Sequence, residues 1–256
     1  NVLTLEGISE IENILEKIFE NNNLKGVIIS SNKDDFSAGM DLKVLAHLQD
    51  QSKNKEEIFQ FVMRAHQFLR KIELGGIDPK TKKGGIPFVW ACNGLSAGIA
   101  TEIGLACHYR IAADKKNTKI GLPEILVGLF PGAGGATRVS RMLGLMSSAP
   151  ILMEGRMFSA QKAKAIGLID KVSNPLDLIN EAKNWILNVK KEDIIKPWDK
   201  KGFKIPGGAP YHPNGFMTFV GASAMISAKT KNVYPAAKYL LSAIYEGALT
   251  NFDNAL

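Results

Sequence analysis

The stretch "IPFVWACNGLSAGIATEIGLACHYRIAAD", residues 86–114, decides the fold class of this chain. Its first part, "IPFVWACNG", is an apolar run that ends in a turn, and it predicts a strand buried on both faces. "GIATEIGLACHY" then has the character of a helix, and "YRIAAD" that of a second short strand. A strand, a helix and another strand in such close succession indicate a parallel sheet with a helical crossover.

The same alternation extends outward from this stretch. Residues 8–21 and 55–74 carry apolar side chains at helical spacing, and "KGVIISS" between them reads as a short, fully buried strand. We therefore expect an α/β core with parallel strands over residues 1–130. From residue 136 the pattern becomes helical. The helices predicted there are "ATRVSRMLGLMSSAPILMEG", "SAQKAKAIG", "PLDLINEAKNWILNV", 215–229 and 235–249, with a Pro-, Gly- and Lys-rich excursion at 196–215.

Composition narrows the class of protein. The chain has 256 residues, 45% hydrophobic and 22% charged, which suits one large folded domain or a core with a smaller appendage. It contains no apolar run long enough for a transmembrane helix, and "NVLTLEG" is not a signal peptide. The only cysteines, Cys92 and Cys107, lie in apolar surroundings, so we expect buried thiols in a reducing cytosol. The four histidines show no metal-binding spacing, and no metal is expected.

The formal charge of +7 favours anionic partners. The lysines, however, are scattered rather than gathered into a stripe interleaved with aromatic residues. This pattern disfavours nucleic acid. Phosphate-bearing small molecules and acidic membranes stay open as anionic partners, and a mostly solvated basic surface is the default interpretation.

Three glycine-bearing turns follow predicted strands: "SAGMDL" (37–42), "NGLSAGIATE" (93–102) and "GLPEILVGLFPGAGG" (121–135). None is a P-loop or a dinucleotide fingerprint, and each alone could be only a turn that starts a helix. Together they are more specific. Helices that begin just after Gly39 and near Gly98 would expose unpaired backbone N–H groups, and two such ends that converge would form an oxyanion hole.

Two glutamates accompany these turns. Glu102 lies about one turn inside the second helix, and Glu124 follows Pro123 in an apolar run with no cation beside it. A carboxylate such as Glu124 is either solvated at a bend or kept close to an apolar site for chemistry. Two glutamates beside an oxyanion hole would supply acid–base catalysis on an activated carbonyl compound.

The segments "DDFSAGMDLK", "NGLSAGIATEIGLACHYRIA" and "KIGLPEILVGLFPGAGGATR" resemble the three signature segments of the crotonase superfamily, above all its enoyl-CoA hydratase/isomerase branch. The resemblance covers roughly residues 1–190 and implies a ββα superhelix followed by a helical region. The later segment "KTKNVYPAAKYLLSAIYEG" resembles the one that joins hydratase to 3-hydroxyacyl-CoA dehydrogenase in multifunctional fatty-acid oxidation proteins. On this basis residues 191–256 are expected to be a linker and helices leading toward an absent dehydrogenase part.

The resemblance also implies roles for single residues. The oxyanion donors would be the backbone N–H groups of Met40 and Ile99, and the catalytic pair would be Glu102 and Glu124. Glu124 is then expected to be an acid or base whose pKa is raised by apolar surroundings. His108 stands where an Asp is common and is interpreted as structural. Contacts with substrate or coenzyme A are implied for Ala38, Gly39, Asp41, Lys43, Gly98, Pro131 and Gly132.

The implied reaction is syn hydration of trans-2-enoyl-CoA to 3-hydroxyacyl-CoA in fatty-acid β-oxidation. Glu102 would activate water for attack at C3, and Glu124 would deliver a proton to C2; the same pair could instead move a double bond, as an isomerase. The alternatives are a non-catalytic CoA-binding or scaffolding domain, or another crotonase chemistry such as decarboxylation or thioester hydrolysis. A CoA thioester is the expected substrate, NAD is expected only for the absent dehydrogenase part, and self-association or assembly with a thiolase subunit is the expected partnership.

Overall fold

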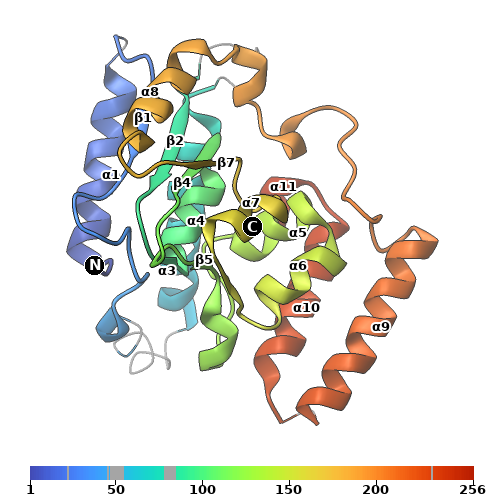
Figure 1. Cartoon of the computed structure of the whole chain (residues 1–256). Coiled ribbons are helices and arrows are strands. Elements are labelled where there is room, and N and C mark those ends of the chain that lie inside the picture. The colour runs from blue at the N-terminus through green and yellow to red at the C-terminus, as the bar shows by residue number, and fades with distance from the viewer. Residues whose placement is uncertain (22, 45, 47–54, 78–84, 232) are drawn as a thin grey trace.

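A parallel four-stranded sheet forms the centre of the molecule (Figure 1). The computed structural model describes residues 1–21, 23–44, 46, 55–77, 85–231 and 233–256. The strands are β1 (Val27–Ile29), β2 (Phe88–Cys92), β4 (Tyr109–Ala113) and β7 (Lys171–Ser173), in the order β1-β2-β4-β7. All three pairings are parallel, which confirms the predicted class of sheet.

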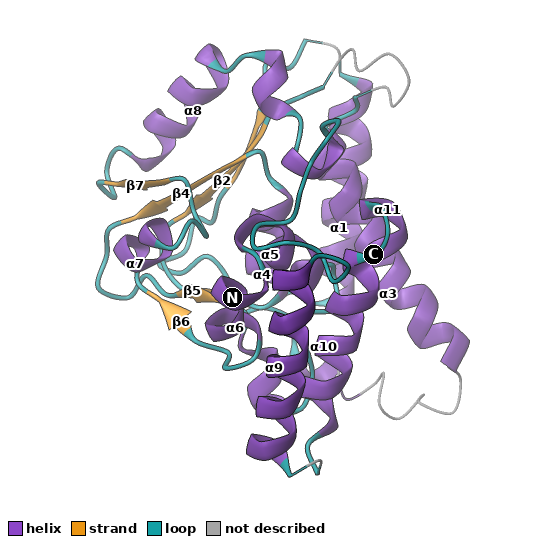
Figure 2. Ribbon diagram, turned by 90° about the vertical axis from the view of Figure 1, so that its right-hand side faces the viewer, coloured by secondary structure: helices purple, strands orange, loops and turns teal. Residues whose placement is uncertain are grey.

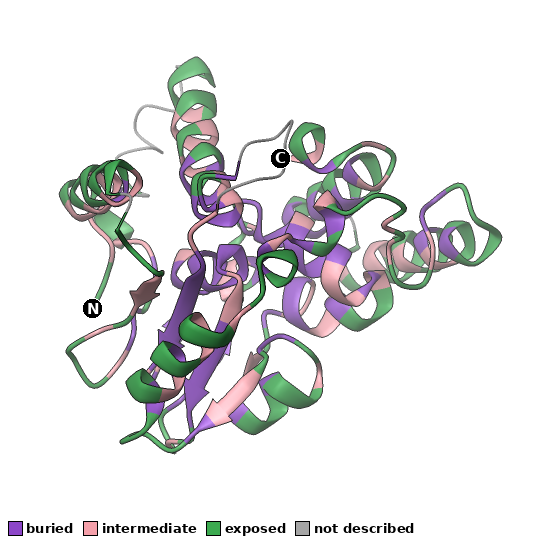
Figure 3. Cartoon of the chain, turned by 90° about the horizontal axis from the view of Figure 1, so that it is seen from above, coloured by how far each residue is buried: buried purple, intermediate pink, exposed green. Residues whose placement is uncertain are grey.

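The two faces of the sheet are covered by different helices. On β2, Phe88 and Trp90 point into the main core, which the helices α3 (Lys55–Leu74) and α4 (Ile99–Ala106) share. Val89 and Ala91 point to the opposite face, where α8 (Leu178–Asn188) covers them. Every residue of β2 is buried, as predicted, because successive side chains enter two separate cores (Figure 3).

The remaining elements surround this centre. A second, smaller sheet has the order β3-β5-β6, with β3 parallel and β6 antiparallel to β5. The bounds of the other elements are α1 Leu5–Glu20, β3 Ser96–Ala97, β5 Ile120–Gly121, the 3₁₀ turn η1 Pro123–Val127, α5 Gly135–Leu143, α6 Leu145–Leu152, β6 Met157–Phe158, α7 Ala160–Ala165, the 3₁₀ turns η2 Lys191–Ile194 and η3 Pro197–Asp199, α9 Pro213–Thr230, α10 Pro235–Ala248 and α11 Phe252–Ala255.

The structure corrects several expectations. Strand β1 is half-buried rather than fully buried. The helical run that starts at residue 136 is two helices, because Gly144 between them has φ +80° and a Cβ there would lie 2.3 Å from the carbonyl oxygen of Pro206. Strands β6 and β7 lie in the part predicted to be helical throughout. The helix predicted to begin just after Gly39 falls partly outside the described residues.

The C-terminal helices lie against the body of the chain. Helix α10 packs beside α5 and α9, and α11 packs on α10 (Figure 2). Helix α10 buries Ala236, Leu240 and Ile244, whereas Tyr239 on the same helix is 62% exposed. Within the described residues, no helix is long and apolar enough to cross a membrane.

Candidate active site

Two of the glycine turns run side by side in parallel. The N–H of Ser37 donates to the carbonyl of Leu95 (2.9 Å), and the N–H of Ala97 donates to that of Ser37 (3.0 Å), so that Ser37 and Ser96 form a parallel bridge. Met40 and Ile99 each lie three residues beyond this bridge, and both line one small cavity.

The approach of the two turns requires glycine. Gly39 has φ +98°, and a Cβ there would lie 2.8 Å from the carbonyl oxygen of Ala97. Only a residue without a side chain allows the two backbones to lie this close.

Both candidate oxyanion donors are available. The N–H of Leu3 donates to the carbonyl of Gly39, and the N–H of Asp41 donates to the carbonyl of Leu3, so the N–H of the intervening Met40 points to the other side. Ile99 is the first residue of α4, where a helical N–H has no partner within the helix. Within the described residues, neither N–H donates to another group of the chain.

Glu102 is held in the core by backbone N–H groups. It lies one turn into α4 and is 2% exposed. Its Oε1 accepts hydrogen bonds from the N–H groups of Ala133 (2.9 Å) and Gly135 (2.7 Å). On balance the pKa of this carboxyl is raised, with burial as the largest cause, and the two N–H groups and the positive charge of Arg138 offset part of that rise. These partners therefore favour the ionised form of a buried carboxylate.

Glu124 has different surroundings. It lies at the start of η1, and its Oε2 is buried with no hydrogen-bond partner among the described residues. Burial and, second, the negative charge of Glu102 raise its pKa to about 8. The carboxyl lies against the start of α4, because a Cβ on Gly98 would be 3.0 Å from Glu124 Oε1. Glu124 is therefore not a solvated residue at a bend.

The structure brings the three glycine turns together. Besides the contacts above, the N–H of Gly98 donates to the carbonyl of Gly121 (3.1 Å). Pro131 and Gly132 belong to the same loop as the two N–H donors to Glu102. Ala38 lies in the first turn, and the N–H of Lys43 donates to Asp41 Oδ1 (2.8 Å), with the Lys43 side chain exposed to solvent.

Two parts of the site were not predicted from the sequence. The N–H groups of Ala133 and Gly135 hold Glu102, although their loop was noted only for possible contacts with substrate. A Cβ on Gly135 would lie 2.7 Å from Glu102 Oε1, so the glycine-rich run itself was the signal.

His108 is structural, as expected: its Nδ1 accepts from the N–H of Phe88, and its Nε2 lies 3.1 Å from the carbonyl oxygen of Glu73.

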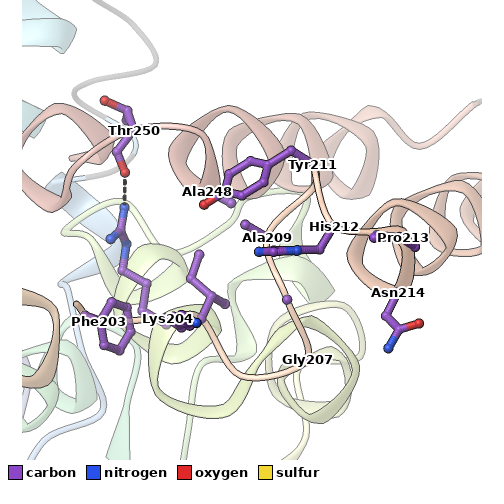
Figure 4. Close-up of a pocket in the computed structure, with 13 residues that line it drawn as sticks. Phe203, Lys204, Gly207, Ala209, Tyr211, His212, Pro213, Asn214, Ala248 and Thr250 are labelled. Carbon is purple, nitrogen blue, oxygen red and sulfur yellow. Dashed lines mark hydrogen bonds between the residues drawn. The ribbon is translucent and has the colours of Figure 1, made fainter.

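Three cavities lie near or beyond these residues. A small apolar one of about 30 Å³ is lined by the side chains of Met40 and Ile99. A large apolar one of about 1030 Å³ begins at Ile125, directly after Glu124, and extends between α6 and α9. A third, of about 520 Å³, lies between residues 203–214 and the end of α10, and none of the predicted site residues lines it (Figure 4).

No cluster of three or more His, Cys, Asp or Glu side chains suited to a metal ion occurs in the part of the chain that the structure describes.

Comparison with known proteins places this geometry in a family. The sequence model described as Enoyl-CoA hydratase/isomerase matches residues 1–196. The chain belongs to this family. As a member of the enoyl-CoA hydratase/isomerase family it has the crotonase-like fold that its three glycine turns resembled, and a helical region follows.

Relatives of this family member include much longer proteins. It is 30% identical to a fatty acid oxidation complex subunit alpha of Vibrio parahaemolyticus over 98% of this chain, and 31% identical to one of Shewanella loihica over 96%. It spans only 34% and 33% of these two relatives, about a third of their length.

Solved structures agree on the fold. An enoyl-CoA hydratase from Bacillus anthracis matches 99% of this chain and 84% of its own, with 27% identity and a TM-score of 0.61. An enoyl-CoA hydratase/isomerase from Xanthobacter autotrophicus, at 18% identity and a TM-score of 0.62, covers 96% of this chain and 78% of its own and supports the fold alone.

Proposed function

We propose that this chain hydrates trans-2-enoyl-CoA thioesters to 3-hydroxyacyl-CoA in fatty-acid β-oxidation. The observation that carries the proposal is the contrast between the two glutamates. Burial raises the pKa of both carboxyls, but Glu102 accepts from two N–H groups that favour its ionised form, whereas Glu124 has a buried oxygen without a partner among the described residues and a pKa of about 8. Such a pair, one carboxyl with donors and one without, can supply one base and one acid. The family match and the relatives named for fatty acid oxidation support this reading.

The reaction follows from the geometry of the site. The thioester oxygen accepts hydrogen bonds from the N–H groups of Met40 and Ile99, which stabilise the negative charge that develops there. Glu102 takes a proton from water as the water oxygen bonds to C3. The electron pair of the double bond moves into an enolate, and Glu124 donates its proton to C2. The hydroxyl of the water is then on C3 and a proton on C2, on one face of the substrate. Glu102 is left protonated and Glu124 ionised, and one proton returns from Glu102 to Glu124 through solvent before the next turnover.

The same pair of groups supports double-bond isomerisation, in which one carboxylate removes a proton and the other returns one. A non-catalytic CoA-binding domain is disfavoured because both glutamates lie at the converging turns, one held by two N–H donors and the other with a buried oxygen that has no partner among the described residues. Decarboxylation and thioester hydrolysis remain the alternatives within the superfamily.

The first prediction is that both glutamates are required for hydration of crotonyl-CoA. Glu102→Gln and Glu124→Gln each remove a proton-transfer group, and each is expected to reduce kcat by about 10²–10⁴-fold. The loss of absorbance of the conjugated thioester measures the rate. Glu10→Gln, on the exposed side of α1, is the matched control and should retain wild-type turnover. Wild-type kcat in either active-site variant would remove that residue from the mechanism.

Coenzyme A is the proposed ligand, with the Lys43 ammonium as a phosphate contact beside the Met40–Asp41 turn. The net charge of +7 supports an attraction to its phosphates. Calorimetric affinity for an acyl-CoA should therefore weaken as salt rises, and Lys43→Met should reduce this dependence. An affinity indifferent to salt would contradict the electrostatic part of the proposal.

We further propose that the natural protein is longer and also carries an NAD-dependent 3-hydroxyacyl-CoA dehydrogenase part. Residues 1–190 would then be the hydratase core, and residues 191–256 the connection. The proposal is supported by relatives of which this chain spans about a third, named as subunits of a fatty acid oxidation complex. Assembly with a thiolase subunit and a cytoplasmic location belong to the same proposal. The intact mass of the natural protein decides it, since a mass near 27.9 kDa would contradict a fusion.

A further inference from the structure

A fully buried ion pair lies behind the loop that holds Glu102. Arg138, on α5, donates from Nε and Nη2 to the two carboxylate oxygens of Glu73 on α3, at 3.0 and 3.1 Å. Neither side chain has any exposed surface. Burying both charges carries a large desolvation cost, so such a pair is weak evidence for a role in stability alone. The question is what else Arg138 contacts.

The third hydrogen bond of Arg138 is to the loop that holds Glu102. Arg138 Nη1 donates to the carbonyl oxygen of Ala133 (2.9 Å), and the N–H of Ala133 donates to Glu102 Oε1 (2.9 Å). The same residue is thus held from both sides, through its carbonyl by the arginine and through its N–H by the carboxylate. The guanidinium lies directly on this loop, because a Cβ on Gly134 would come within 2.5 Å of Arg138 Nη1.

The arginine is itself fixed in orientation. Its two bonds to Glu73 use both oxygens of one carboxylate, an arrangement that fixes the plane of the guanidinium. Glu73 is anchored in turn by Arg70, one turn earlier on α3, at 3.0 Å. The chain of contacts therefore runs from α3 through Arg138 to the loop and ends on Glu102.

We propose that Arg138, oriented by Glu73, is a positioning residue for Glu102: it holds the Ala133 carbonyl so that the N–H groups of Ala133 and Gly135 keep the carboxylate in one orientation. The inference rests on the proposed function, because it concerns the base of that reaction. Arg138 acts through the loop and not on the substrate.

The decisive variant is Arg138→Met, which keeps the volume and removes the donors. Glu73 retains its partner Arg70, so no unpaired charge is left in the core. We expect kcat for crotonyl-CoA to fall about 10²-fold, as for a displaced catalytic group, with KM near that of the wild type. The acid limb of the pH profile should also move to higher pH, because the charge of Arg138 lowers the pKa of Glu102.

A matched control is available elsewhere in the core. Arg110→Met removes an arginine that is also buried and paired, with Asp170 at 2.7 Å, but that makes no hydrogen bond or ion pair with the 131–135 loop among the described residues. Its kcat and acid limb should stay at the wild-type values. Equal effects of Arg110→Met and Arg138→Met would show a general packing defect and overturn the proposal.

Glu124 on η1 and His66 on α3 also titrate near this loop. A shift in the pH profile must therefore be assigned to Glu102 by a separate measurement. Arg138 lowers the pKa of His66 as well. The Glu102 carboxyl is therefore followed by ¹³C NMR in the protein without substrate, with its signal assigned by its loss in Glu102→Gln. If the Glu102 titration is unchanged in Arg138→Met, the positioning role is overturned, whether or not the wild-type protein hydrates crotonyl-CoA. If the wild-type protein does not hydrate crotonyl-CoA, only the proposed function is contradicted.

Arg138→Lys keeps the test open if the Met variant does not fold. It retains the charge but cannot donate to both Glu73 oxygens and to Ala133 at once. We expect the acid limb near its wild-type position and a kcat below that of the wild type. A wild-type kcat in Arg138→Lys would overturn the proposal, because the geometry of the guanidinium would then be dispensable.

Discussion

Glu124 and Glu102 have the same side chain and opposite surroundings. Glu102 has two backbone N–H donors and Arg138 nearby, whereas Glu124 has a buried, unpartnered oxygen beside a second carboxylate. Because the two groups interact, their titration belongs to the pair. At the scale of the residue, the hydrogen-bond donors around each carboxyl distinguish the proposed base, Glu102, from the proposed acid, Glu124.

This assignment predicts the alkaline limb of the activity. Glu124 must carry its proton to act as an acid, and its pKa is about 8. The kcat/KM for crotonyl-CoA is therefore expected to decline as pH rises through about 8. A pH–rate profile checks this prediction. A kcat/KM that stays unchanged up to pH 10 would contradict the role of Glu124 as the acid.

The same pKa also predicts how stability depends on pH. The folded-state pKa lies above the unfolded value, so the folded form binds more protons between about pH 4.5 and 8. The contribution of Glu124 to stability is complete below this window and is lost as pH rises through it. Denaturant unfolding of wild type and Glu124→Gln across the window should show a smaller decline for the variant; parallel declines would contradict the assignment.

A second residue-scale prediction concerns Gly98. This glycine has φ +58°, and a Cβ there would lie 3.0 Å from Glu124 Oε1. Gly98→Ala should reduce kcat about 10²-fold by displacing the carboxyl and straining the start of α4. Gly202→Ala is the control, since Gly202 has φ +81° but no atom within 4 Å of the added Cβ. Equal kcat values in the two variants would show that the glycine at position 98 is not needed for activity.

At the scale of the element, α4 is the helix on which the site depends. Its first turn presents the Ile99 N–H and Glu102, and its far end is closed by a buried lysine. Lys196 Nζ donates to the carbonyl oxygens of Leu105 (2.8 Å) and Cys107 (2.6 Å). Burial lowers the pKa of this amine to about 7, but in either protonation state it can donate to carbonyls that have no partner within the helix.

Removal of this cap should destabilise the protein. Lys196→Met leaves two buried carbonyls without a donor, each of which costs about 1–3 kcal/mol. The free energy of unfolding in urea is expected to fall by roughly 2–4 kcal/mol, a sum of two such costs discounted for relaxation. Lys201→Met, at an exposed position of the same segment, should change it by less than about 0.5 kcal/mol. Equal unfolding midpoints for the two variants would show that the cap contributes nothing.

At the scale of the whole molecule, the C-terminal end closes onto the core around one aromatic ring. Phe252 of α11 is 3% exposed and stacks on Trp198 with the ring centroids 4.8 Å apart. The guanidinium groups of Arg70, Arg138 and Arg141 lie 4.8 to 5.5 Å from its centroid. Residues from four distant parts of the sequence thus meet there, beside the ion pair that holds the Ala133 loop.

Phe252→Ala is therefore expected to act on the whole fold. Loss of a buried phenylalanine ring costs about 3–5 kcal/mol, which for a chain of this size lowers Tm by roughly 10 °C. Phe216→Ala, at a ring that is 55% exposed on α9, should lower Tm by no more than about 2 °C. Calorimetry distinguishes them, and a Tm of Phe252→Ala near that of the wild type would show that α11 is detached in solution.

The sequence by itself determined the class of sheet, the buried strand at residues 88–92, the long helix at 55–74 and the three glycine turns. These features are local: a period of 3.6 residues, an unbroken apolar run, or a glycine where a backbone must turn. The resemblance of the turns also named the family before any contact was known. At these positions the chemistry of neighbouring residues leaves only one local structure.

Only the tertiary structure decided which groups hold those elements together. The sequence does not show that Glu73 pairs with Arg138, or that the Ala133 N–H donates to Glu102. Such contacts join residues that are far apart in the chain, so they produce no periodic pattern in the sequence. The three-residue strand β7 was missed for the same reason, since its partner β4 lies far away in the chain. The pKa of Glu124 depends on burial and on the charge of Glu102, two consequences of how the turns pack against one another.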